Sequence, residues 1–132
     1  MSNIRANTIG DTAGTGPITL TKQSAAKTWV NFNGATSTDP ASMTGVRGSF
    51  NVSSILDNGT GLYTVNFSQN MANVNYSVSI TTGESNAMTI TNRACCVSST
   101  LASSVSGSFY TATGGARIDM PCNSFIIHGD LA

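Results

Sequence analysis

The chain has 132 residues, with six Lys and Arg, six Asp and Glu, and a net charge of zero at pH 7. This length suits a single domain that buries a hydrophobic core. The basic residues are scattered singly, so we predict no direct nucleic-acid partner, because neutralising many phosphates requires a basic patch. No apolar run is long enough to span a membrane, and no signal peptide follows Met1, so we expect synthesis in a cytosol and no membrane insertion.

The first residues and the rest of the chain differ in character. Residues 1–16 carry few large apolar side chains and several glycines, which predicts an extended N-terminal arm. Residues 17–132 are the predicted β-sandwich domain. It opens with a strand over residues 17–21, and residues 23–27 then allow a single helical turn.

The next predicted strand, residues 28–33, contains the single tryptophan, Trp29, which we expect either in the core or at a subunit interface. Residues 34–45 are poor in large apolar side chains and predict a long surface loop. One strand is then expected over residues 46–52. A turn follows at residues 57–61, where an Asn-Gly pair suits positive φ angles.

Residues 61–68 and 75–82 are the clearest strand predictions, because apolar side chains alternate there with Ser, Thr and Asn. The alternating apolar residues are Tyr63, Val65 and Phe67 in the first segment, and Tyr76, Val78 and Ile80 in the second. This period of two places one face in a core and the other in water. Residues 69–74 join the two segments, which is typical of antiparallel folds.

Weaker strand patterns complete the domain, and turn residues separate several of them. They cover residues 87–91, 94–98, 105–111, 116–120 and 124–128. No segment keeps a helical period over three turns. The sequence therefore predicts an all-β fold, an antiparallel, jelly-roll-like β-sandwich with an extended N-terminal arm.

The residues that catalysis or metal binding would need do not occur together. The single histidine, His128, lies close to the last residue, and the acidic residues are isolated and mostly beside turn residues. Residues 57–61 superficially resemble a calcium loop but lack its alternating oxygen ligands. Residues 10–17 are glycine-rich without the Gly-Lys-Ser/Thr ending of a phosphate loop. We predict no enzyme, no catalytic residues, no cofactor and no metal site.

The three cysteines, Cys95, Cys96 and Cys122, cannot all pair within one chain. Neighbouring residues of a strand point to opposite faces, so we expect Cys95 and Cys96 in different environments, one of them buried as a small apolar group. A structural role is the prediction for these thiols. A metal or redox site is the alternative.

Several segments are similar in amino-acid sequence to segments of a known group of proteins. These segments are Ile4-Arg5-Ala6-Asn7-Thr8-Ile9, Gly14-Thr15-Gly16-Pro17, Leu20-Thr21-Lys22-Gln23-Ser24-Ala25-Ala26-Lys27, Trp29-Val30-Asn31-Phe32-Asn33-Gly34, Ser49-Phe50-Asn51-Val52-Ser53-Ser54, Asp57-Asn58-Gly59-Thr60-Gly61, Tyr63-Thr64-Val65-Asn66-Phe67 and His128-Gly129-Asp130-Leu131-Ala132. Together they resemble structural proteins of tailed bacteriophages, particularly those of cyanobacterial and other aquatic hosts. In those proteins a similar module often forms the C-terminal part of tail-fibre-like chains.

This resemblance implies a non-enzymatic virion protein, made in the cytoplasm of the host bacterium, in which the sandwich assembles as a homotrimer with other virion proteins. Its loops would contact the host surface as a tail-fibre or adhesin knob. The chain departs from long fibres because Met1 almost adjoins the module, without shaft or collagen-like repeats. The alternative is therefore a capsid decoration (cement) protein that clamps major capsid subunits through its N-terminal arm.

Ser, Thr and Asn side chains can hydrogen-bond the hydroxyl groups of a host surface glycan. We would expect glycan contacts in the loops at residues 34–45, 83–87 and 112–116. The same side chains also make up an ordinary soluble β-surface. The sequence therefore assigns no individual receptor-binding residue.

Overall fold

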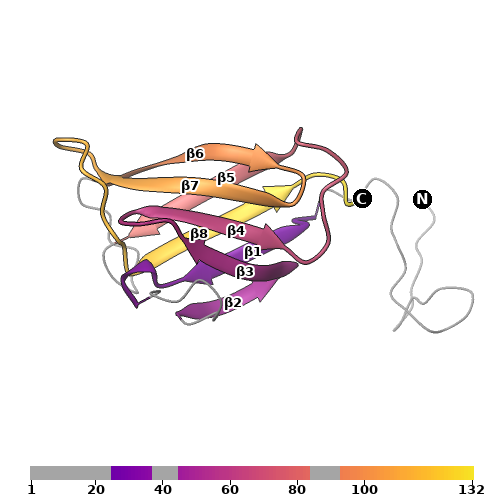
Figure 1. Cartoon of the computed structure of the whole chain (residues 1–132), viewed down its shortest axis with the longest axis horizontal. Coiled ribbons are helices and arrows are strands. Elements are labelled where there is room, and N and C mark those ends of the chain that lie inside the picture. Colours follow the sequence, from indigo (N-terminus) through magenta and orange to yellow (C-terminus); the bar gives the residue numbers. More distant parts are fainter. Residues whose placement is uncertain (1–24, 37–44, 84–92) are drawn as a thin grey trace, which may run out of the picture.

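A computed structural model describes residues 25–36, 45–83 and 93–132 (Figure 1). In these residues the chain forms two four-stranded sheets that pack face to face, as the sequence predicts. The expected arm, the strand at residues 17–21 and the whole pattern at residues 87–91 lie outside the described residues.

Every neighbouring pair of strands is antiparallel, with order β2-β1-β8-β5 in sheet A and β3-β4-β7-β6 in sheet B. The elements are β1 (Thr28–Phe32), η1 (Gly34–Thr36, a 3₁₀ helix), β2 (Val46–Phe50), β3 (Val52–Asp57), β4 (Leu62–Phe67), β5 (Ser77–Gly83), β6 (Arg93–Leu101), β7 (Ser104–Thr111) and β8 (Cys122–His128). The first described strand pairs with the last at the centre of sheet A, and β4 pairs with β7 at the centre of sheet B. The chain changes sheet after β2, β4, β5 and β7, so both sheets contain strands from both halves of the chain.

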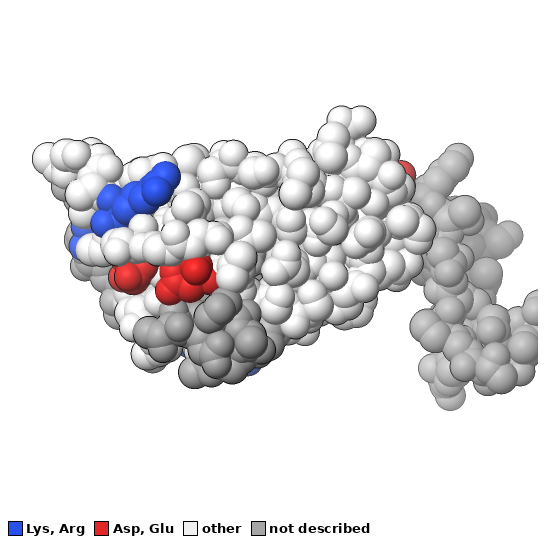
Figure 2. Space-filling view, in the orientation of Figure 1, with Lys and Arg blue, Asp and Glu red and all other residues white. Residues whose placement is uncertain are grey.

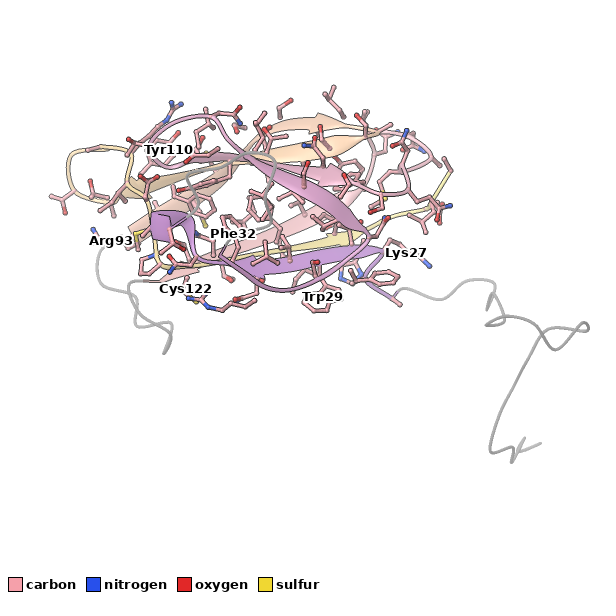
Figure 3. All side chains as sticks on the ribbon, turned by 60° about the horizontal axis from the view of Figure 1, so that its bottom comes forward. Lys27, Trp29, Phe32, Arg93, Tyr110 and Cys122 are labelled. Atoms are coloured by element: carbon pink, nitrogen blue, oxygen red, sulfur yellow. The ribbon has the colours of Figure 1, made fainter. Side chains whose placement is uncertain are left out.

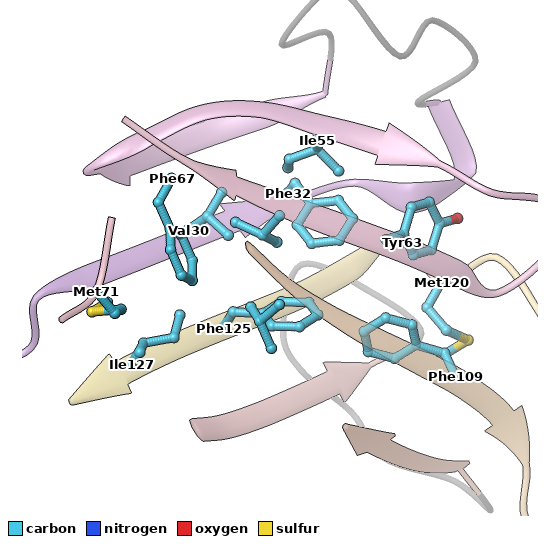
Figure 4. Close-up of a cluster of buried hydrophobic side chains, with 12 residues drawn as sticks. Val30, Phe32, Ile55, Tyr63, Phe67, Met71, Phe109, Met120, Phe125 and Ile127 are labelled. Carbon is cyan, nitrogen blue, oxygen red and sulfur yellow. The ribbon is translucent and has the colours of Figure 1, made fainter. Parts of the chain in front are cut away.

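The core lies between the two sheets and is dominated by aromatic rings (Figure 4). The predicted alternation holds in β4, where Tyr63, Val65 and Phe67 are buried. The ring centroids of Phe32 and Tyr63 lie 5.2 Å apart across the sandwich, in the edge-to-face arrangement that aromatic pairs favour. In β5, Val78 and Ile80 are only partly buried against this core.

Residues 46–52 do not form the single strand that the apolar pattern predicts. The chain breaks at Asn51, which has a φ of 57°, so that β2 belongs to sheet A and β3 to sheet B. Asn tolerates this left-handed conformation better than most residues, because its short amide can bond the nearby backbone. The Asn51 amide accepts a hydrogen bond from Gln69 N at 2.7 Å and donates to Thr28 Oγ1 at 3.0 Å.

The two clearest predicted strands, β4 and β5, lie in opposite sheets and do not pair with each other, because residues 68–76 cross between the sheets. Other local predictions change. Residues 116–120 form no strand and make only an isolated bridge between Tyr110 and Arg117, while residues 25–27 are not helical. The weak pattern at residues 94–98 extends to the longer strand β6.

The register of the strands gives the sandwich two different ends. At one, the loop end, β1 and β5 finish opposite the start of β8, and β6 starts opposite the last residue of β7. The turn between β3 and β4 also lies here. The other, the terminal end, holds residues 25–27 and 129–132 together with Asn51 and residues 68–76. Figure 1 shows these ends at the left and right of the sandwich.

Candidate functional surfaces

Charged side chains gather at the loop end. In Figure 2 those visible on this face lie mainly over the left end, beside the connection from β7 to β8, and most of the remaining surface is uncharged. Asp57 closes the β3–β4 turn there by accepting a hydrogen bond from Gly59 N at 2.8 Å. Residues 57–61 are therefore the turn that the sequence predicts, with positive φ at Gly59 and Gly61.

Beneath this surface, a buried tyrosine ties three loop-end segments together. The Tyr63 hydroxyl lies 2.6 Å from Asp119 Oδ1 and 3.1 Å from the carbonyl oxygen of Gly34, while Gly61 N donates to the same carboxylate oxygen at 2.6 Å. Burial and the hydrogen bond to Asp119 raise the pKa of Tyr63 far above its usual value. This phenol stays protonated and inaccessible, so its role is to hold the loops in place.

A second buried group supports the same end. Asn123 donates from Nδ2 to the carbonyl oxygen of Met120 at 2.8 Å and accepts from Thr82 Oγ1 at 2.9 Å. Asn123 is fully buried, so these bonds satisfy polar atoms that would otherwise be costly to bury. Buried hydrogen bonds from both sheets thus hold the loop end in place. No sequence motif predicted either of these two networks.

The outer face of sheet B carries uncharged polar side chains in cross-strand pairs. Thr64 Oγ1 and Ser106 Oγ are 2.7 Å apart, and Asn66 Nδ2 donates to Ser54 Oγ at 2.9 Å. These side chains largely satisfy one another. Part of the Ser, Thr and Asn content that suggested glycan contact therefore stabilises this face.

The outer face of sheet A is different, because an apolar row crosses three of its strands. Trp29 of β1 stands opposite Phe50 of β2 and Ile126 of β8. All three are exposed, and we call them the sheet A stripe. Figure 3 shows Trp29 projecting away from the sandwich while Phe32 points into it. A core position for Trp29 is therefore wrong, whereas the interface expectation stays a prediction.

The three cysteines and the histidine lie in different environments. Cys95 packs partly buried against the core with its pKa raised by burial, Cys96 is exposed on the other face of β6, and Cys122 is buried; the three cysteines form no disulfide with one another. The opposite environments of Cys95 and Cys96 are as predicted. His128 is exposed at the end of β8, opposite Ser77.

The described part of the chain has no group of three or more His, Cys, Asp or Glu side chains that could share a metal ion. It also contains no helix with the length and apolar character of a membrane span.

Of the predicted glycan loops, the described residues include 34–36, 45, 83 and 112–116, all at the loop end. Residues 37–44 and 84–87 lie outside them.

Comparison of the chain with models of protein families, with curated proteins and with solved structures finds no match.

Proposed function

We propose that this chain is a non-enzymatic structural protein of a bacteriophage virion, a trimeric tail-fibre or adhesin knob that contacts the host cell surface. The observation that carries the proposal is the separation of the two ends of the sandwich. The segment that leads into β1 and the last residues of the chain lie at the terminal end, whereas the β3–β4 turn and the exposed residues 112–116 between β7 and β8 lie at the loop end.

This polarity suits a module that is anchored at one end and presents loops at the other. The terminal end is well tied: Ala72 N donates to the carbonyl oxygen of Asp130 at 2.8 Å, and Ala132 N donates to that of Asn70 at 2.9 Å. A preceding arm would leave from this end, so it could hold the sandwich on a particle without covering the loops.

At the loop end, residues 112–116 are the best candidates for contact with a host surface glycan. All five are exposed. Gly114 and Gly115 have positive φ angles and open space around them, so the tip of the segment projects into solvent at these two glycines. The fixed Tyr63–Asp119 pair beneath supplies the rigid support that a binding loop needs.

Localisation in particles tests the proposal directly. Virions purified from the source of this chain should contain it in fixed stoichiometry, and density or antibody label should lie at the tail tip. Absence from purified particles would rule out a virion role. Label on the capsid faces or three-fold axes would instead support capsid decoration, the alternative reading of the sequence.

Host contact requires a separate test with a matched control. Replacing residues 112–116 by a Gly-Ser segment of equal length should abolish binding of the labelled protein to host cells while the domain stays folded. The control replaces Asn73 and Val74, which are exposed in the β4–β5 connection at the terminal end. Undiminished binding after the loop exchange would remove residues 112–116 from the receptor site.

A further inference from the structure

The sheet A stripe is an apolar surface that no part of the described chain covers. Trp29, Phe50 and Ile126 keep 40%, 55% and 39% of their surface exposed. They share one row of the sheet, because the register sets Trp29 opposite both of the others. Gly48 lies beside the indole, and a β-carbon there would come within 3.2 Å of Trp29 Cη2. The stripe is therefore a continuous, shallow surface.

The surroundings of the stripe are polar but largely uncharged. Ser79 continues the row on β5, and Asn31, Gly48 and Ser124 occupy the next row towards the loop end. Arg47 reaches past Asn31 to the carbonyl oxygen of Pro121, 2.7 Å from Nη2, and so lies towards the loop end. An apolar centre with a polar border is the usual layout of a protein–protein interface.

We infer that the outer face of sheet A is a self-association interface, and that its occupant is the same face of another copy of this chain. A lone extended segment laid on this face would leave its own backbone N–H and C=O groups unpaired. Another sheet arrives with its backbone bonds already made, so the same face of two or three copies can meet around a closed symmetry axis. The exposed apolar side chains on the outer face of sheet B, Leu56 and Leu101, stand in separate rows opposite Thr64 and Ser104, so that face has no comparable apolar row.

Charge and size are consistent with this occupant. The net charge is zero, and the stripe itself holds no charged residue; Lys27 flanks it towards the terminal end and Arg47 towards the loop end, so identical faces meet without like charges at their centre. Four strands spaced by about 4.8 Å, with rows rising about 3.3 Å per residue, make a face of roughly 20 by 20 Å. This is smaller than the roughly 800 Å² per partner of a standard interface, so we expect association that depends on concentration.

The single tryptophan makes the interface directly measurable. Sedimentation velocity of the full chain across the micromolar range should show species of two or three times the 13.6 kDa monomer mass. Over the same range, Trp29 emission should shift to the blue and quenching by acrylamide should fall, because the indole leaves water on association. The inference rests on this face and not on the virion role, so the two can fail separately.

Matched variants distinguish loss of an apolar side chain in the stripe from loss of an equally exposed one elsewhere. Phe50→Thr should hold the protein monomeric and keep the Trp29 emission red-shifted at every concentration. The control is Leu101→Thr, because Leu101 is also 55% exposed but lies in sheet B, and it should assemble like the wild type. Ser79→Lys provides a second test, since it removes no apolar contact and places like charges in the proposed interface.

Three outcomes would overturn the inference. One is a wild-type protein that remains monomeric throughout the micromolar range. Another is unchanged assembly of both Phe50→Thr and Ser79→Lys. The third is a monomer whose Trp29 is protected from acrylamide until residues 2–24 are deleted, because the chain's own N-terminal segment would then cover the stripe.

Discussion

Gly34 has no room for a side chain. A β-carbon there would lie 2.6 Å from Tyr63 Oη and 2.9 Å from Asn123 Nδ2, so both buried networks would have to move. We expect Gly34→Ala to lower the free energy of unfolding by about 1–3 kcal/mol, the range typical of overpacked interiors. Urea denaturation measures the change. Gly48→Ala is the control, because its neighbour is the exposed Trp29 ring; an equal loss in both variants would contradict the argument.

Tyr63 should make the stability of the fold sensitive to alkaline pH. Its usual pKa is 10.0, and burial together with the Asp119 bond raises the pKa in the folded protein. The unfolded chain therefore loses this proton first, so the stabilisation is complete below pH 10 and falls as the pH rises further, by up to about 1.4 kcal/mol per pH unit.

Tyr63→Phe isolates this effect, because the other tyrosines remain in both proteins. The variant should lose about 1.5–3 kcal/mol at neutral pH, the usual cost of a hydrogen bond to a charged group. Above pH 10 its unfolding free energy should fall less steeply than that of the wild type. Parallel curves from urea titrations between neutral and strongly alkaline pH would show that Tyr63 ionises normally in the folded state.

At the scale of elements, the crossing from β2 to β3 depends on Asn51. Asn51→Gly keeps access to the φ of 57° and loses the side-chain bonds to Thr28 and Gln69. Asn51→Ala loses the same bonds and also strains the backbone, so it should be less stable than Asn51→Gly by about 1–2 kcal/mol. Thermal and urea unfolding of the two variants compare them directly. An Ala variant as stable as the Gly variant would show that the backbone relaxes freely.

The period of two in residues 61–68 was sufficient to predict β4 and its buried face, because a local pattern fixes which side of one strand faces the core. The partner of each strand is a non-local property and was harder to predict. Nothing near β4 shows that it pairs with β7 while β5 pairs with β8. The prediction of a single strand over residues 46–52 was wrong for a related reason, since the apolar pattern continues through Asn51 although the backbone turns there.

For the whole molecule, the candidate surfaces were only partly visible in the sequence. Trp29 stood out as an anchor because it is the single tryptophan, but Phe50 and Ile126 became its neighbours only through the strand register. The predicted loop at residues 112–116 was correctly placed outside the strands. That it lies at the opposite end of the sandwich from residues 25–27 and 129–132 follows from topology rather than from any local pattern.

The stripe and the loop end lie on different surfaces, so the assembled protein can use both. A trimer around sheet A that points its three loop ends the same way would bind a glycan surface with an avidity about 10²–10⁴-fold above that of a single copy. Phe50→Thr should therefore release from host cells much faster than the wild type or Leu101→Thr, while its initial attachment at high protein concentration persists. Exchange of residues 112–116 should abolish attachment in every background. Release rates of labelled protein from cells measure the difference, and a monomeric Phe50→Thr that releases as slowly as the wild type would show that binding uses one site at a time.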